Sequence, residues 1–173
     1  MKHVISVFAL LAAGVIFSNC NSEDDPKPDD DAAVFETLDR GAIMALEAEL
    51  SNGNVTVTDE DGAILSEESG NNIVVYKTSA GRFGKMKIES IDLPTEANNR
   101  YTLHIAAVTY NEDGTVFKES SNLTVRSLFT CDLDQMIETS DINVEYDFRF
   151  GRATETECYF QLANSARLKV LGE

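Results

Sequence analysis

Three cysteines carry the most reactive side chains in this sequence of 173 residues. Cys20 follows a run of fourteen uncharged residues, 4–17, which begins after a short basic start. That length suits the apolar core of an export signal and is too short for a membrane-spanning helix, which needs about 20 residues. A thiol at the end of such a core can be acylated once the preceding peptide is removed. We therefore predict a signal peptide over 1–19 and lipidation of Cys20, with a plain secretory signal cut elsewhere as the alternative.

The residues around Cys20 resemble a bacterial lipoprotein signal. The usual signal has Leu where this chain has Phe17, and Gly or Ala where it has Asn19. Relaxed signals of this kind occur in Bacteroidota. The next residues resemble the acidic export signal of their surface lipoproteins: Ser22, Glu23, Asp24 and Asp25. The resemblance implies a protein that is lipid-anchored in the outer membrane and faces the extracellular side.

Residues 20–31 are predicted to be a disordered acidic tether behind the lipidated cysteine. The stretch 21–31 holds six acidic residues, one Lys and two Pro, with no aliphatic or aromatic side chain. Such a segment cannot bury enough apolar area to become ordered, and its eleven residues can span on the order of 30 Å. We expect the folded domain over 32–173.

The charge balance restricts the partners. The chain has a formal charge of −16, and removing Lys2 and Lys27 leaves 12 basic residues against 24 acidic ones in 32–173. Nucleic acid and anionic lipid are therefore unfavourable partners for the domain, because both depend on Lys and Arg to neutralise phosphates. With only two His in the chain, we predict no metal site and no cofactor.

Cys131 and Cys158 remain as an even pair in an exported chain, and we predict a disulfide between them. It would close a loop of about 27 residues and stabilise the fold by about 3 to 3.5 kcal/mol. The alternative is two buried thiols. A catalytic thiol would need a nearby imidazole, and His104, the one His outside the leader, lies inside a predicted strand.

Several acidic patterns could do chemistry but have simpler explanations. Five residues fit positions 3, 5, 6, 8 and 12 of a calcium-binding loop, but position 1 is Val57 and the flanks read as strands, so a hairpin turn is preferred. Carboxylate pairs could serve glycoside hydrolysis, yet they arise by chance among so many acids, and no Trp offers a sugar platform. The calcium pattern is Asp59, Asp61, Gly62, Ile64 and Glu68, and the pairs are Glu67 with Glu68, Asp132 with Asp134, and Glu155 with Glu157.

The remaining pattern is that of short β-strands separated by turns. Asp-Gly pairs at 61–62 and 113–114 stand between β-rich runs and predict two hairpins. Apolar and polar residues alternate most clearly over 142–150, which predicts a half-buried strand. Over 42–50 the composition favours a helix and the β-rich context favours a strand, and we expect a strand. Further strands are expected over 72–77, 83–93, 101–110, 115–118, 122–128, 158–162 and 167–171.

Part of this pattern resembles a fibronectin type III or related immunoglobulin-like domain. The match covers 93–125: a Leu-Pro turn, a strand starting at Tyr101 as in a tyrosine corner, and a final strand after a Ser-rich turn. It departs from the family because no Trp marks an early core strand and 48 residues follow Val125. The resemblance implies an all-β, immunoglobulin-like antiparallel sandwich. Residues 127–173 either extend that sandwich or form a small second unit beside 32–126.

These features favour a non-catalytic surface protein that binds a glycan or a cell-envelope protein. Aromatic rings on a sheet face or loop could make such contacts, or could pack in the core. A structural or accessory subunit of an outer-membrane uptake complex is the main alternative, and a hydrolase with a carboxylate pair is a remote one. The candidate rings are Tyr76, Tyr110, Phe117, Tyr146, Tyr159 and Phe160.

Overall fold

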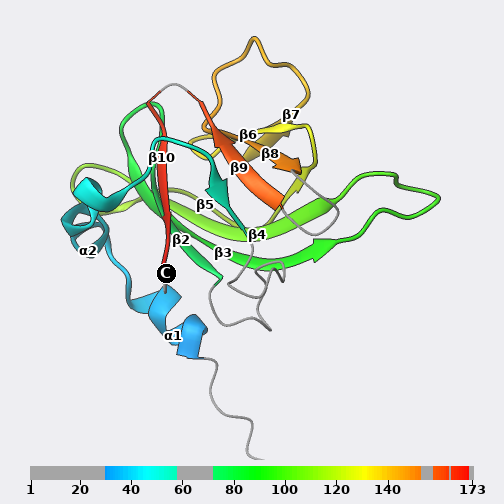
Figure 1. The fold of residues 1–173 in the computed structure, drawn as a ribbon. Helices are drawn as coiled ribbons and strands as arrows, with labels where there is room; N and C mark the ends of the chain where they lie inside the picture. The colour runs from blue at the N-terminus through cyan, green and yellow to red at the C-terminus, as the bar shows by residue number, and fades with distance from the viewer. Residues whose placement is uncertain (1–29, 58–71, 153–157, 164, 172–173) are drawn as a thin grey trace, which may run out of the picture.

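The computed structural model describes residues 30–57, 72–152, 158–163 and 165–171. Within them lie two antiparallel sheets of five strands each. The first sheet has the order β10-β2-β3-β4-β5 and the second β1-β9-β8-β6-β7. Figure 1 shows the sheets as two facing layers. The predicted all-β sandwich is therefore confirmed.

The chain crosses between the two sheets three times: β1 lies in the second sheet, β2 to β5 in the first, β6 to β9 in the second and β10 in the first. Two short helices precede the first strand, α1 (Asp30–Thr37) and α2 (Arg40–Ala45), followed by a 3-10 helix (Glu47–Glu49). The strands are β1 (Val55–Thr56), β2 (Ile73–Lys77), β3 (Phe83–Asp92), β4 (Thr102–Tyr110), β5 (Val116–Arg126), β6 (Thr130–Asp132), β7 (Ile137–Thr139), β8 (Phe148–Arg152), β9 (Cys158–Leu162) and β10 (Arg167–Val170). Because β10 pairs with β2 while β8 and β9 lie in the second sheet, the strands after residue 126 extend the same sandwich.

The core lies between the sheets and is built by side-chain alternation. From β4, Leu103, Ile105 and Ala107 point inward, and all three are buried. Phe148 and Phe160 contribute from the second sheet, with ring centroids 4.6 Å apart in a T-shaped contact. Burial of such side chains contributes about 1.5–3 kcal/mol each.

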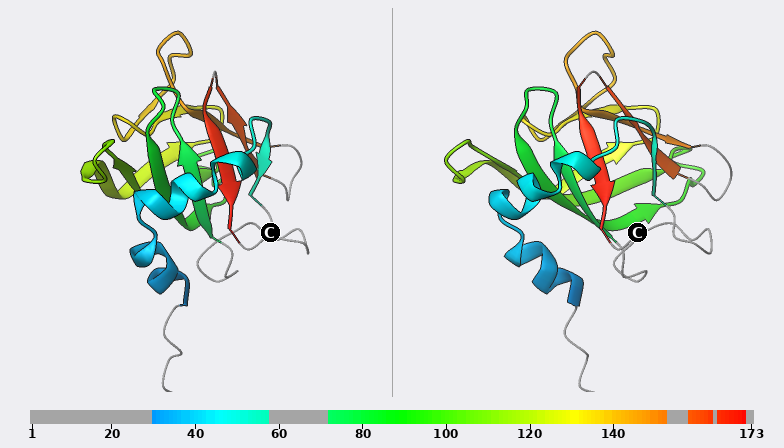
Figure 2. Two further views of the ribbon diagram at one scale, coloured as in Figure 1. Left: turned by 90° about the vertical axis from the view of Figure 1, so that its left-hand side faces the viewer. Right: turned by 60° about the vertical axis from the view of Figure 1, so that its left-hand side comes forward.

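A second, smaller hydrophobic cluster covers part of the outer face of the first sheet. Ile43 of α2 and Leu50 pack there with Val75, Phe83 and Tyr110. Figure 2 shows α2 lying across this face, in front of β10 and β2. The strand expected over 42–50 is thus wrong: the segment is helical because Asp39 caps α2 at the Ala42 amide, 2.8 Å away, and its apolar residues pack on a sheet.

Some of the predicted turns and strands are present in the structure and others are not. The turn at 111–114 is confirmed, with Gly114 at φ 86° between β4 and β5. The turn at 78–82 connects β2 to β3, with Gly81 at φ 89°. The first half of the predicted strand 142–150 is wrong, because Asn143 donates to Asp141 in a turn and Ile142 is 63% exposed. The hairpin at 61–62 lies outside the described residues.

The predicted disulfide is absent. Cys131 and Cys158 are both buried, and no disulfide joins them. They lie on opposite sides of β8, where Cys131 pairs with Phe148 and Cys158 with Arg152. Four residues of strand span about 13 Å, whereas bridged Cα atoms lie less than about 7 Å apart. Burial raises the pKa of the Cys131 thiol well above its usual value, which makes it a poor nucleophile.

Candidate functional site

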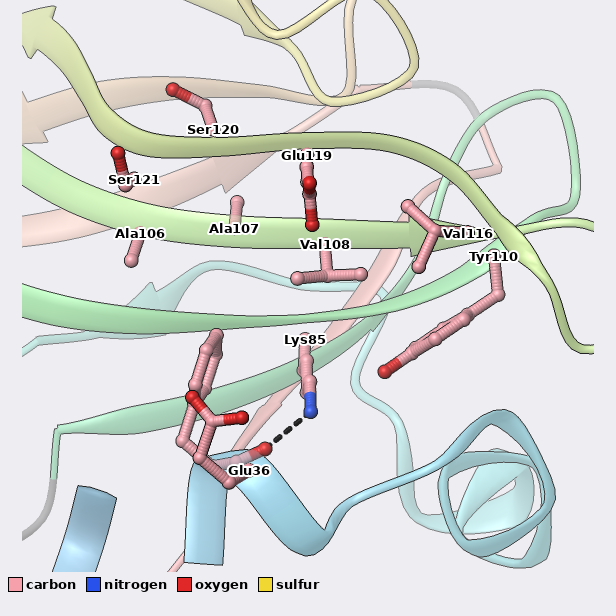
Figure 3. Close-up of a pocket in the computed structure, with 11 residues that line it drawn as sticks. Glu36, Lys85, Ala106, Ala107, Val108, Tyr110, Val116, Glu119, Ser120 and Ser121 are labelled. Carbon is pink, nitrogen blue, oxygen red and sulfur yellow. Dashed lines mark hydrogen bonds between the residues drawn. The ribbon is translucent and has the colours of Figure 1, made fainter. Parts of the chain in front are cut away.

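An open groove of about 800 Å³ lies on the outer face of the first sheet, between α1 and the strands β4 and β5. It exists because the outward-facing side chains of β4 are small at this point, notably Ala106. In the pairing of β4 with β5 the register shifts beside Ala106, so this part of the sheet is irregular. Figure 3 shows the lining residues, which include Ala106, Val108, Val116, Glu119, Ser120 and Ser121.

Lys85 supplies the positive charge of the groove. Its side chain points from β3 toward α1, where the ammonium group donates to the Phe35 carbonyl oxygen (Figure 3). The same nitrogen lies 4.7 Å from the centre of the Phe35 ring. Burial lowers the pKa of Lys85, while the nearby Glu36 and Asp39 carboxylates oppose that shift. Lys85 therefore holds α1 against the sheet and fixes one wall of the groove.

Tyr110 closes the end of the groove nearest α2. Its hydroxyl donates to the Leu38 carbonyl oxygen at 3.1 Å, and the ring is 8% exposed. Burial raises its pKa, and so do the neighbouring Asp39 and Glu36 carboxylates. Chemically the groove offers one ammonium, the Glu36 and Glu119 carboxylates, and serine hydroxyls beside small apolar side chains. Such a surface suits non-covalent recognition of a ligand with both polar and apolar parts.

A smaller pocket of about 210 Å³ gathers acidic residues between the two sheets. It brings together the predicted pair Asp132 and Asp134, and adds Asp147. Asp134 accepts from Arg82 at 2.9 Å and from Thr78 at 3.3 Å, and burial raises its pKa. These contacts tie Asp134 to the β2–β3 turn.

Asp147 in the same pocket uses both carboxylate oxygens on backbone amides. Oδ1 accepts from Ser79 at 2.6 Å and Oδ2 from Leu133 at 2.7 Å. The side chain thus joins the β2–β3 turn of one sheet to the end of β6 in the other. With both oxygens occupied, Asp147 acts as a structural clamp. No group of three or more His, Cys, Asp or Glu within the described ranges is placed to hold a metal ion.

The other residues singled out from the sequence are distributed as follows. Cys20 and the export signal at 22–25 lie outside the described residues, as do the calcium pattern at 59–68 and the pairs at 67–68 and 155–157. His104 bonds to Asp92, with 2.8 Å between Nε2 and Oδ2. Of the aromatic candidates, Tyr76 and Phe160 are fully buried, and Phe117 lies beneath Arg82, 4.0 Å from its Cζ to the ring centre.

Sequence reasoning missed the groove because its walls come from segments far apart in the chain. The one local signal was the run of small residues Ala106-Ala107 and Ser120-Ser121 in two neighbouring strands. Comparison with known proteins adds no relative: no family model, curated protein or solved structure matches this chain. In the described part of the chain, no helix is long and apolar enough to cross a membrane.

Proposed function

We propose that this chain is a non-catalytic, lipid-anchored surface protein that binds an extended segment of a cell-envelope protein in the groove between α1 and β5. The observation that carries this proposal is the open groove of about 800 Å³ beside an edge strand. Its volume falls within the range of about 300–1,000 Å³ typical of ligand sites.

The position of β5 favours a peptide as the ligand. β5 ends the order of the first sheet, so no described strand of that sheet lies beyond it. Its residues 116–119 are exposed, and four of the groove-lining residues belong to this strand. An edge strand offers backbone donors and acceptors to an incoming extended chain, while the groove beside it accommodates alternate side chains.

The lining favours a peptide over a glycan. Sugar rings stack on exposed aromatic faces, and the two rings at the groove, Phe35 and Tyr110, are engaged with Lys85 and with Leu38. The walls instead present one cation and two carboxylates, which can pair with charged side chains of a partner.

The test places a photo-crosslinking amino acid at Ser121 on intact cells and identifies the captured protein by mass spectrometry. Affinity for that purified partner is then measured with Ala106→Trp, which fills the groove floor, and with Thr124→Trp, a matched exposed position on β5 outside the groove. We expect Ala106→Trp to weaken binding by about tenfold or more and Thr124→Trp to leave it within about twofold.

Three outcomes would overturn the proposal. Equal binding by Ala106→Trp and wild type would place the partner elsewhere on the molecule. If a glycan array gives the signal that Ala106→Trp abolishes and no protein is captured, the ligand is a saccharide. If neither assay gives a signal that Ala106→Trp removes, the protein is instead an accessory subunit without a ligand of its own.

A further inference from the structure

Three arginines from separate parts of the chain meet at the turn between β5 and β6. Arg100 and Arg126 both lie over the Phe129 ring, with their Cζ atoms 5.3 Å and 4.3 Å from its centre. Arg149 of β8 donates from Nε to the Leu128 carbonyl oxygen at 3.2 Å. This arginine cluster (Arg100, Arg126 and Arg149) is unusual in a chain with a formal charge of −16.

The cluster is only partly neutralised. Glu138 Oε1 accepts from Nε and Nη2 of Arg126 at 2.9 Å and 2.5 Å, and its Oε2 accepts from the Arg126 backbone amide. This contact raises the pKa of Arg126. In the described part of the chain, Glu138 is the one carboxylate that forms an ion pair with any of the three arginines. Among the described residues, Arg100 and Arg149 therefore have no carboxylate partner.

Glu138 also shows that the geometry suits an oxyanion. A carboxylate that is held by three N–H groups on one residue occupies the position that a phosphate, sulfate or carboxylate of a ligand would take. Arginine is the residue best suited to such groups, because its planar fork donates two parallel hydrogen bonds and keeps its charge at all physiological pH values.

The turn has a strained backbone at Leu128, and the apolar side chain of this residue is exposed. Leu128 has φ 75°, a left-handed conformation that is rare for residues other than Gly. The backbone is held there by a hydrogen bond from the Leu128 amide to the Phe150 carbonyl oxygen at 2.8 Å. The side chain is 54% exposed. Strained residues of this kind cluster at binding sites.

From these contacts we propose that the arginine cluster binds a phosphate or sulfate monoester carried on a saccharide. A discrete anionic group fits better than an extended polyanion, because the rest of this acidic domain repels any large negatively charged surface beyond the immediate contact. Leu128 would then pack against the apolar face of the sugar that carries the anion. This site lies apart from the groove of the proposed function, since the two share no lining residue.

The test titrates the purified full-length protein with glucose 6-sulfate, which carries one sulfate monoester, and, as the neutral control, with glucose. We expect saturable binding of the sulfated sugar and no binding of the neutral one. In NMR spectra, the backbone amide signals of residues 126–130 should change their chemical shifts most. The double variant Arg100→Gln with Arg149→Gln should weaken binding by about tenfold or more, because each removes a charge-assisted contact. Two single variants at an exposed arginine of β10, Arg167→Gln and Arg167→Lys, serve as controls and should stay within about twofold of wild type.

A further variant separates binding from a purely structural role, since Arg100 and Arg149 also support the turn. Glu138→Gln removes the internal carboxylate and frees the Arg126 fork, so it should raise affinity by about three- to tenfold. No binding of glucose 6-sulfate, an equal loss in Arg167→Gln, or an unchanged or weaker affinity in Glu138→Gln would overturn the proposal. Binding to phosphatidylglycerol vesicles without binding to the sulfated sugar would also overturn it, in favour of a lipid surface.

Discussion

The Tyr76 ring lies directly on the backbone of Gly84 in the neighbouring strand, so that a Cβ at Gly84 would stand 2.3 Å from the Tyr76 Cζ atom. The ring is fully buried, and its hydroxyl is 2.8 Å from the Thr109 hydroxyl, which in turn donates to the Leu133 carbonyl oxygen at 2.8 Å. This chain of contacts crosses from the first sheet to the second. The missing side chain at Gly84 is what makes room for it.

Gly84→Ala should therefore destabilise the fold. The new methyl group forces the Tyr76 ring to move and breaks its contact with Thr109, at a cost of about 1–3 kcal/mol. Gly53→Ala is the matched control, because its nearest neighbour, the Ser51 Oγ atom, is 3.8 Å away. Urea unfolding of both variants checks the difference, and equal midpoints for the two would contradict this account of Gly84.

Asp147 makes the free energy of unfolding depend on pH. Burial raises its pKa to about 6 in the folded protein, against a usual value of 3.8, while the Ser79 and Leu133 amides oppose the shift. Since the folded state then holds the proton more tightly than the unfolded state, stability rises as pH falls from about 7 to 4, and is lost as pH rises through 6. The full change is about 3 kcal/mol.

The measurement compares urea unfolding of wild type and Asp147→Asn at pH 7.5 and pH 5. Wild type should gain stability at the lower pH, and Asp147→Asn should gain markedly less, because the amide cannot take up the proton. The pKa of Asp134 is also raised in the folded protein, and its charge contributes to the raised pKa of Asp147, so the difference between the two proteins measures Asp147 together with its coupling to Asp134. Parallel pH profiles for the two proteins would rule out this role.

Strands that alternate and end at turn residues could be predicted from the sequence. The strands over 72–77 and 158–162 match to within one residue, because most of their apolar side chains are buried and neither has a competing local structure. The alternating pattern gave a wrong prediction over 142–147, where Ile142 and Val144 are exposed and the Asp141 side chain closes a turn. Periodicity alone does not show whether a face has a partner to pack against.

The helix over Arg40–Ala45 and the candidate groove could not be predicted from the sequence, because both depend on how distant segments pack together. The capping Asp39 was visible in the sequence, but whether an amphipathic segment packs on a sheet depends on the outer face that Val75 and Phe83 present. The groove depends in the same way on the position of α1 against β4 and β5, which no local pattern determines. The disulfide prediction was wrong for a related reason. A count of cysteines does not show that β8 lies between Cys131 and Cys158.

The two cysteines of the domain should be reduced in the native protein. Without reductant, urea-unfolded protein should react with two equivalents of maleimide at Cys131 and Cys158, and the native protein with almost none, because both side chains are buried. Dithiothreitol should leave the unfolding midpoint unchanged. Labelling followed by peptide mass spectrometry checks this. Recovery of a peptide that links the two cysteines would contradict the structure.

Surface display should depend on the acidic residues after Cys20. External protease on intact cells should digest the domain of wild type, and replacement of Glu23, Asp24 and Asp25 with Ala should protect it by retaining the protein on the inner face of the membrane. A matched variant with three Ala substitutions at Asp29, Asp30 and Asp31 removes the same charge further along the chain, where α1 begins at Asp30, and should remain accessible. Equal digestion of both variants would show that charge at 23–25 is not the signal.

Membrane attachment should depend on the Cys20 thiol. Attached acyl chains contribute about 0.8 kcal/mol per buried methylene, so two or more chains hold a protein on a bilayer that its net negative charge would otherwise repel. Cys20→Ala should therefore move the protein from the membrane fraction to the soluble fraction, while Asn21→Ala should leave it membrane-bound. Mass spectrometry of the mature amino terminus gives the independent measurement: acylated Cys20 as the first residue is expected. An unmodified terminus elsewhere in the chain would disprove lipid anchoring and leave export by a plain secretory signal as the explanation of the leader.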